Sequence, residues 1–271
     1  MRDFTGKVAV ITGAGGGIGK ALAERCVAEG MRVVLADVNR ADLHNAETAL
    51  RAIGAEVLSV PTDVSIATDV ENLAQKTLQA FGVVHLLFNN AGVMGASAGA
   101  SPWQTKLTDW EWVLGVNLWG VIHGIHVFTP IMLAQGCESR IVNTASVVGL
   151  LSHNPYAPYH VSKHAVVALT ENLQYALQQA GTLVSAGVLC PGWTNTRLMD
   201  VARYETAASN DIETATTRQM RQAAAAGISP GHVAECVFNG IRAGQFYIFT
   251  GDDVDARIRE RMENILGRHN P

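Results

Sequence analysis

The chain has 271 residues, a mass of 28.9 kDa, a formal net charge of −4 and a pI near 6.1. Hydrophobic residues make up 48% and charged residues 16%, which supplies a large core and argues against disorder. The slightly acidic balance, without a basic run, argues against a nucleic acid or an anionic membrane as a partner.

The N-terminus and the cysteines indicate a cytoplasmic protein. No signal-peptide pattern precedes the apolar run that begins at Lys7. The four cysteines lie far apart without paired spacing, at Cys26, Cys137, Cys190 and Cys236. We therefore expect reduced, buried thiols rather than disulfides.

The first half of the chain alternates short apolar runs with helically periodic stretches. We expect strands over residues 7–12, 32–37, 57–60 and 84–89, and helices over 18–30, about 40–53 and about 66–80. This alternation predicts a parallel sheet with helices on both faces.

A long uncharged helix follows a Gly-, Ala- and Ser-rich loop at residues 92–101. We expect it to start near Thr108, a good N-cap, and to kink or end at Pro130. No Asp, Glu, Lys or Arg occurs between Glu111 and Glu138, but polar residues are spread through this stretch. A spanning helix needs about twenty apolar residues, so a helix buried in the core or in a subunit interface fits better than a membrane span.

The remaining elements complete one domain. They are strands at 140–145, 183–189 and 245–249, a helix ending near 180, a helix opened by Pro230 and a closing helix over about 252–267. The polar segment of about 193–228 is long enough to be a substrate lid. No linker or repeat divides residues 1–271, so we expect a single doubly wound, mostly parallel α/β domain of the Rossmann type with about seven strands.

A glycine-rich turn follows the first strand and opens the first helix. Gly13, Gly17 and Gly19 form a Thr-Gly-x-x-x-Gly-Ile-Gly pattern, with Ile18 between the last two. Glycine lets backbone N–H groups and a helix N-terminus come close to a phosphate. A tight turn without a ligand is the alternative, but the strand before it and the helix after it favour a dinucleotide site.

Asp37 closes the second strand. A carboxylate there accepts hydrogen bonds from both hydroxyls of an adenosine ribose and repels a 2′-phosphate, so NAD is favoured over NADP. Arg40 weakens this preference, because an arginine nearby could pair with a 2′-phosphate. The alternative for Asp37 is a strand-end acid that caps the next turn.

Tyr159 and Lys163 lie four residues apart on the helix after the fifth strand, so both side chains leave one face. An isolated tyrosine titrates near ~10. A fixed positive charge nearby lowers that pKa, which gives a proton donor and acceptor suited to neutral pH. The spacing alone is common and also fits a solvated helix face.

Two neighbouring patterns compete with this pair. His160 and His164 share the spacing of a helical metal pair, but no Glu lies between them and no third ligand is evident, so no metal is expected. Tyr156, seven residues before Lys163, would lie on the same helix face, but Pro158 disfavours regular helix at Ala157. Tyr156 is therefore expected to face the substrate.

In order and spacing these residues resemble the short-chain dehydrogenase/reductase family of single-domain type, over nearly the whole chain. The resemblance is carried by Thr12-Gly13-x-x-x-Gly17-Ile18-Gly19, Asp63-Val64, Asn89-Asn90-Ala91-Gly92, Asn117, Ser146, Tyr159-x-x-x-Lys163 and Pro191-Gly192-x-x-x-Thr196. The sequence departs from the family at Thr194, where Val is frequent, and has Trp193 before it. Gly16 stands where NADP-using members often carry a basic residue, which supports NAD.

The resemblance implies a role for each matching residue. Tyr159 would be the general acid/base at the substrate oxygen, and Lys163 would lower its pKa and hold the nicotinamide ribose. Ser146 would polarise the substrate carbonyl or alcohol, and Asn117 would hold a water that links Lys163 to solvent. The other cofactor contacts would be Asp63 and Val64 at the adenine, Asn90 near the adenosine ribose, and Thr196 on the carboxamide or phosphate side, together with Pro191 and Thr194.

The substrate is expected to enter between the loop at 93–103, the segment after Ser146 and the lid. The expected contacts are Met94, Trp103, Ser152, His153, Tyr156, Trp193 and Met199. There is no obvious arginine clamp for a carboxylate or phosphate, although Arg197 and Arg203 lie in the lid. We therefore expect a fairly bulky, uncharged secondary alcohol or ketone.

These observations predict an NAD(H)-dependent alcohol dehydrogenase or ketoreductase. One alternative is an NADP-dependent carbonyl reductase. A non-catalytic cofactor sensor would need a broken tetrad, and a lyase or epimerase of this fold tends to be longer, with a different glycine spacing. The uncharged helix and the helix of Tyr159 resemble the pair that buries against a neighbouring subunit in this family, which predicts a homotetramer.

Overall fold

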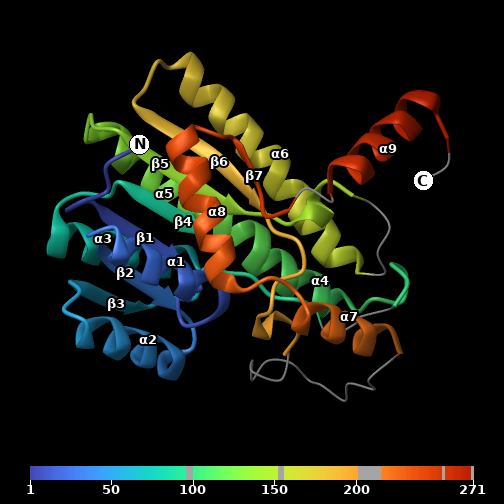
Figure 1. Ribbon diagram of the computed structural model, residues 1–271, viewed down its shortest axis with the longest axis horizontal. Helices are drawn as coiled ribbons and strands as arrows, with labels where there is room; N and C mark the ends of the chain where they lie inside the picture. Colours follow the sequence, from blue (N-terminus) through green and yellow to red (C-terminus); the bar gives the residue numbers. More distant parts are fainter. Residues whose placement is uncertain (96–99, 152–155, 201–214, 252–253, 270–271) are drawn as a thin grey trace.

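The computed structural model of the protein describes residues 1–95, 100–151, 156–200, 215–251 and 254–269. A seven-stranded sheet of order β3-β2-β1-β4-β5-β6-β7 lies at its centre, with every neighbouring pair parallel. The strands are β1 (Val8–Thr12), β2 (Arg32–Asp37), β3 (Val57–Pro61), β4 (Leu86–Asn89), β5 (Ser139–Thr144), β6 (Val184–Cys190) and β7 (Tyr247–Phe249). Helices lie on both faces, which confirms the expected doubly wound fold (Figure 1).

The helices connect successive strands of the sheet. They are α1 (Gly17–Ala28), α2 (Arg40–Ala52), α3 (Ala67–Phe81), α4 (Leu107–Leu114), α5 (Gly120–Ala134), α6 (Ala157–Gln179), α7 (Ala215–Ala225), α8 (Pro230–Ala243) and α9 (Val254–Gly267). Three short turns interrupt or extend them: the π-helical η1 (Gly115–Trp119) and the 3-10 turns η2 (Val147–Gly149) and η3 (Arg197–Met199).

The two faces of the sheet form two separate hydrophobic cores. Ala9 and Ile11 of β1 point to the core under α1, α2 and α8, whereas Val8 and Val10 point to the core under α3, α5 and α6. Successive side chains of a strand alternate between faces. Because both faces are buried, the strands read as continuous apolar runs.

The strand order reverses between β1 and β4. The helices that leave these two strands therefore cover opposite faces, and a crevice opens at the carboxyl ends of the strands, where such folds bind ligands. The glycine-rich turn after β1 and the ends of β2, β4, β5 and β6 meet at this edge of the sheet.

The uncharged helix lacks the expected Thr108 cap and does not end at Pro130, which leaves a kink there as the remaining expectation. α4 begins at Leu107 with Lys106 at the N-cap, so Thr108 lies inside the first turn and does not cap it. Pro130 lies inside α5, which continues for another turn. The proline removes one backbone donor, but neighbouring residues such as Phe128 are fully buried against the sheet and hold the helix in place.

By length and composition alone, the stretch Leu107–Ala134 could cross a membrane, because its mean hydropathy is 1.4. In the fold it covers one face of the sheet, where α5 packs on α3 and β4. Only 33% of its most apolar window is buried. Part of this apolar surface therefore faces outward.

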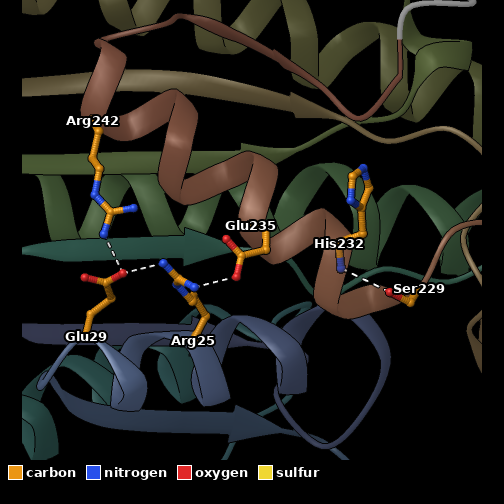
Figure 2. Close-up of polar contacts among 6 residues, drawn as sticks. All are labelled: Arg25, Glu29, Ser229, His232, Glu235 and Arg242. Atoms are coloured by element: carbon orange, nitrogen blue, oxygen red, sulfur yellow. Dashed lines mark hydrogen bonds and ion pairs between the residues drawn. The ribbon is translucent and has the colours of Figure 1, made fainter.

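Ion pairs hold α1 against α8 (Figure 2). The Glu29 carboxylate accepts hydrogen bonds from Arg25 and Arg242, and Arg25 also pairs with Glu235 of α8. Burial alone would raise the pKa of Glu29, but its hydrogen bonds to Arg242 and Arg25 outweigh burial and hold that pKa below its usual range. These contacts fix α1, whose first turn forms part of the site described below.

All four cysteines are free thiols. Cys26 and Cys190 are buried, as expected, but Cys137 and Cys236 are only partly buried, so the expectation of four buried thiols is wrong for this second pair. Burial raises the pKa of the Cys190 thiol to about 12, which makes it unreactive at neutral pH.

Candidate active site

A cavity of about 1020 Å³ opens at the carboxyl ends of the strands. Ligand pockets of small molecules and cofactors reach about this size. The structure brings most of the sequence-predicted residues to its walls: Gly13, Gly17, Ile18, Asp37, Asp63, Val64, Asn90, Met94, Ser146, Tyr159, Lys163, Pro191, Trp193, Thr194, Thr196 and Met199. The expected cofactor and substrate regions form one continuous space.

The turn between β1 and α1 requires glycine at several points. Gly13 and Gly17 have φ angles of 67° and 52°, in the left-handed region. A Cβ atom on Gly13 would lie 2.9 Å from the Ala91 Cα, and one on Gly19 would lie 2.1 Å from the Gly13 carbonyl oxygen. Gly19 is absent from the cavity wall and instead lets α1 pack against the turn. No side chain caps α1, so its first N–H groups are available to an anion.

Asp37 lines the cavity, and each of its two carboxylate oxygens accepts one backbone N–H. Its Oδ2 accepts the Gly15 N–H at 2.9 Å, and its Oδ1 accepts the Asn39 N–H at 2.9 Å. A carboxylate has about four lone-pair sites, so acceptor capacity remains for ribose hydroxyls. Arg40 also lines the cavity.

Asn90 ties together the ends of three strands. Its backbone N–H donates to the Thr12 hydroxyl at 2.9 Å, and its side-chain Nδ2 donates to the Thr12 carbonyl at 3.0 Å. Thr144 donates to the Asn90 Oδ1 at 3.3 Å. Asn90 therefore holds β1, β4 and β5 in register at the cavity, beyond any contact it makes to a ribose.

Asn117 lies in the π-helical turn η1 and is fully buried, outside the cavity wall. Its Oδ1 accepts the Val93 N–H at 2.8 Å, and its Nδ2 donates to the Val93 carbonyl at 3.0 Å and to the Ser162 hydroxyl at 3.2 Å. Ser162 in turn donates to the Tyr159 carbonyl at 2.7 Å. The side chain thus joins the segment after β4 to α6; single π turns of this kind recur at functional sites.

Tyr159 and Lys163 project from the first two turns of α6 and are both buried. The Lys163 Nζ lies 5.5 Å from the centroid of the Tyr159 ring and donates to the Thr144 carbonyl at 2.9 Å. Ser146 lies on the same cavity wall, and its hydroxyl donates to the Pro191 carbonyl at 3.4 Å. A hydroxyl, a phenol and an ammonium group therefore converge at the inner end of the cavity.

The pKa of Tyr159 differs from the sequence expectation. Burial raises the pKa of Tyr159 to about 12, and the hydrogen bond to Ser146 opposes this only partly. Burial also lowers the pKa of Lys163 to about 8. The expectation that Lys163 lowers the pKa of the phenol is wrong for the protein without cofactor, because loss of solvation dominates both groups.

The substrate end of the cavity is apolar. Its side chains form a buried cluster of Met94, Tyr156, Tyr159, Met199, Met220 and Ala224, against which Val148 and Leu198 pack. Tyr156 lies within this cluster rather than on the cavity wall. The cavity wall also includes Met220, Trp112 and Arg257, which the sequence analysis did not predict. For Met220 the sequence does carry a signal, because Met220 and Ala224 have helical spacing on α7.

Trp103, like Tyr156, is an expected substrate contact that does not line the cavity. Trp103 is 85% exposed and outside the wall, because it lies on a surface turn before α4. Ser152 and His153 lie outside the described residues.

Known proteins of similar sequence and structure point to one family. The short chain dehydrogenase family matches residues 7–207. The 1-deoxy-11-beta-hydroxypentalenate dehydrogenase of Streptomyces avermitilis is 34% identical over 95% of this chain and 89% of its own length, and the cyclohexanol dehydrogenase of Acinetobacter sp. is 33% identical over 75% and 78%.

A solved structure extends this likeness to the fold. A short-chain dehydrogenase/reductase from Burkholderia phymatum, in complex with NAD, is 46% identical, covers 100% of this chain and 98% of its own, and superposes with a TM-score of 0.95. Its family binds NAD or NADP and acts on small molecules. The chain therefore belongs to the short-chain dehydrogenase/reductase family of oxidoreductases.

Proposed function

We propose that the protein transfers a hydride between NAD(H) and a secondary alcohol or ketone, with Tyr159 as general acid/base. The observation that carries this proposal is that Ser146, Tyr159 and Lys163 line one cavity, with the Lys163 Nζ 5.5 Å from the Tyr159 ring centroid, and that this cavity continues to the glycine-rich turn. The glycine positions that admit no Cβ, the uncapped α1 and the Asp37 carboxylate fit a dinucleotide.

Each residue of the inner cavity has a defined task in this reaction. When bound, the nicotinamide ring exchanges a hydride with the carbon that bears the substrate oxygen. Ser146 and Tyr159 hydrogen-bond that oxygen and stabilise the negative charge that develops on it. Tyr159 gives its proton to the oxygen during reduction and takes it back during oxidation. The apolar cluster excludes water from this exchange.

Lys163 supplies positive charge close to the phenol. In the protein alone burial outweighs this charge and leaves the pKa of Tyr159 at about 12. Oxidised nicotinamide is itself a cation, so its binding adds a second positive charge and favours the phenolate. The buried phenol is therefore proposed to become a base only when the cofactor is present.

Replacing Tyr159 separates chemistry from binding. We expect Tyr159→Phe to lower kcat by about 10²–10⁴-fold, the range for loss of a general acid/base, while the Kd for NADH stays within about twofold. Tyr156→Phe is the matched control, because Tyr156 packs in the adjacent cluster and should retain most activity. Steady-state rates and NADH fluorescence titrations measure both; equal losses in the two variants would contradict the assignment.

The buried Lys163 is expected to cost stability. Burial lowers the pKa of Lys163 from 10.5 to about 8. The buried ammonium group therefore lowers the free energy of unfolding by its full amount below pH 8, and this loss fades as the pH rises toward 10.5. The free energy of unfolding of Lys163→Met should therefore exceed that of the parent by about 1 kcal/mol or more at pH 7. This difference should shrink at pH 10.

Urea denaturation without nucleotide measures this difference. Lys76→Met, which removes an exposed lysine from α3, is the control and should show no such trend with pH. A Lys163→Met variant that is less stable than the parent at both pH values would contradict the prediction.

NAD is the proposed cofactor. Asp37 supports it, and so does the NAD in the similar Burkholderia phymatum structure. We expect kcat/KM with NAD(H) to exceed that with NADP(H) by at least about tenfold, which corresponds to ~1.4 kcal/mol of repulsion. Asp37→Ser should shift this ratio toward NADP(H). A parent enzyme that prefers NADP(H) would favour the alternative in which Arg40, on the same cavity wall, pairs with a 2′-phosphate.

The proposed substrate is bulky, largely apolar and uncharged at the reacting end. The methionine-lined cluster supports this, because methionine side chains adapt to irregular apolar shapes. The names of both dehydrogenase relatives refer to hydroxyl-bearing compounds. The segment 193–228 is proposed to cover the bound substrate, since Trp193, Met199 and Met220 line the cavity. Residues 201–214 of this segment lie outside the described residues.

The protein is proposed to form a cytoplasmic homotetramer. The free thiols fit the reducing compartment. Large apolar side chains remain exposed on the α4–α5 segment and on α6, with Trp119 52%, Val161 48% and Tyr175 63% exposed. Such a surface is expected to bury against another copy.

Light scattering tests the oligomer. We expect a solution mass four times that of the chain, and Val161→Arg, which places a charge on this apolar surface, should reduce it. A monomeric mass for the parent would contradict the proposal.

A further inference from the structure

An ion pair crosses the outer edge of the cavity beside the glycine-rich turn. The Arg197 Nη2 of η3 lies 2.8 Å from the Asp42 Oδ2 in the first turn of α2, although 155 positions separate the two residues in sequence. The two elements belong to different parts of the fold: α2 covers the sheet beside β2, and η3 follows β6. The pair is therefore a tertiary link across the site.

Both partners lie against the tip of the glycine-rich turn. A Cβ atom on Gly15 would lie 2.9 Å from the Asp42 Cβ, and one on Gly16 would lie 3.3 Å from the Arg197 Nη2. Arg197 and Gly16 also share the cavity wall. The ion pair thus spans the turn that is proposed to hold the cofactor phosphates.

The chain just before Arg197 is anchored. The Ile228 N–H donates to the Trp193 carbonyl at 3.0 Å, and the Asn195 N–H donates to the Ile228 carbonyl at 2.9 Å. This short parallel pairing closes the base of the segment 193–228. Arg197 lies two residues beyond it, and the next two residues of η3, Leu198 and Met199, pack in the apolar cluster. Opening the ion pair would therefore release the Arg197 side chain while its backbone stays anchored on both sides.

We propose that the Asp42–Arg197 ion pair is a latch that holds the Arg197 side chain across the glycine-rich turn, so that nucleotide enters and leaves only when the pair opens. This inference rests on the proposed binding of NAD(H). The Arg197 side chain is 53% exposed and that of Asp42 is 19% exposed. Partly exposed pairs are weak and are screened by salt, which suits a link that must open in each catalytic cycle.

The latch makes a kinetic prediction that direct phosphate binding by Arg197 does not make. Removing either partner should speed both association and dissociation of NADH by about two- to fivefold, the range that an exposed ion pair supports, with little change in Kd. The double variant should have NADH rates close to those of Arg197→Gln, because the Asp42–Arg197 pair is already absent in that single variant. High salt should speed the parent in the same way.

Stopped-flow fluorescence of NADH with the full chain tests this in Asp42→Asn, Arg197→Gln and the double variant. Arg51→Gln is the control, because it removes an ion pair with Glu47 (2.9 Å) on the same helix but away from the cavity. Its NADH rates should equal those of the parent.

Each other outcome overturns the proposal in a recognisable way. A higher Kd in Arg197→Gln but not in Asp42→Asn would make Arg197 a phosphate ligand instead of a latch. Unchanged NADH rates in both variants would overturn the latch alone. A parent protein that does not bind NADH would overturn the proposed function together with the latch.

Discussion

Loss of solvation at the carboxyl ends of the strands controls the chemistry of this protein. Tyr159 and Lys163 are taken out of water together, and burial shifts the pKa of the phenol up and that of the ammonium down. Both shifts favour the neutral forms. A buried phenol of this kind is a poor base alone, which ties its proposed activity to the positive charge that arrives with the oxidised cofactor.

The surrounding contacts serve to hold this pair in place. Lys163 is anchored on the carbonyl of Thr144 at the end of β5, and the Ser162 side chain connects the backbone of Tyr159 to Asn117. Asn117 in turn holds the backbone of Val93 after β4. Two strand ends and two helices thus fix the inner cavity, so a bound substrate meets groups that are already oriented.

The end of the cavity near the glycine-rich turn is built differently. Its wall includes glycines and the charged side chains of Asp37, Arg40 and Asp63, and Asp37 accepts backbone N–H donors with both carboxylate oxygens. The Asp42–Arg197 pair lies at the edge of the cavity, with Arg197 on its wall, and is partly exposed. Buried hydrogen bonds thus surround Tyr159 and Lys163, whereas the Asp42–Arg197 ion pair is partly exposed to solvent at the proposed entry of the cofactor.

Much of the fold was predictable because its signals are local. Short apolar runs separated by helical periods placed all seven strands within a few residues, and the i, i+4 spacing placed Tyr159 and Lys163 on one face of α6. Contacts between distant segments left no local signal: Thr12 bonds Asn90 across 78 positions, and the π-helical turn that holds Asn117 has no sequence pattern of its own. The exposure of Trp103 and the raised pKa of Tyr159 depend on tertiary burial, which spacing cannot report.

Isotope transfer tests the central claim most directly. A secondary alcohol that carries deuterium on the carbon of its hydroxyl group would be incubated with the enzyme and NAD, and the nucleotide product analysed by mass spectrometry. Direct hydride transfer should give NADH that is heavier by a single deuterium, formed together with the ketone. Ketone formed with unlabelled NADH, or without any reduced nucleotide, would contradict direct hydride transfer in this cavity.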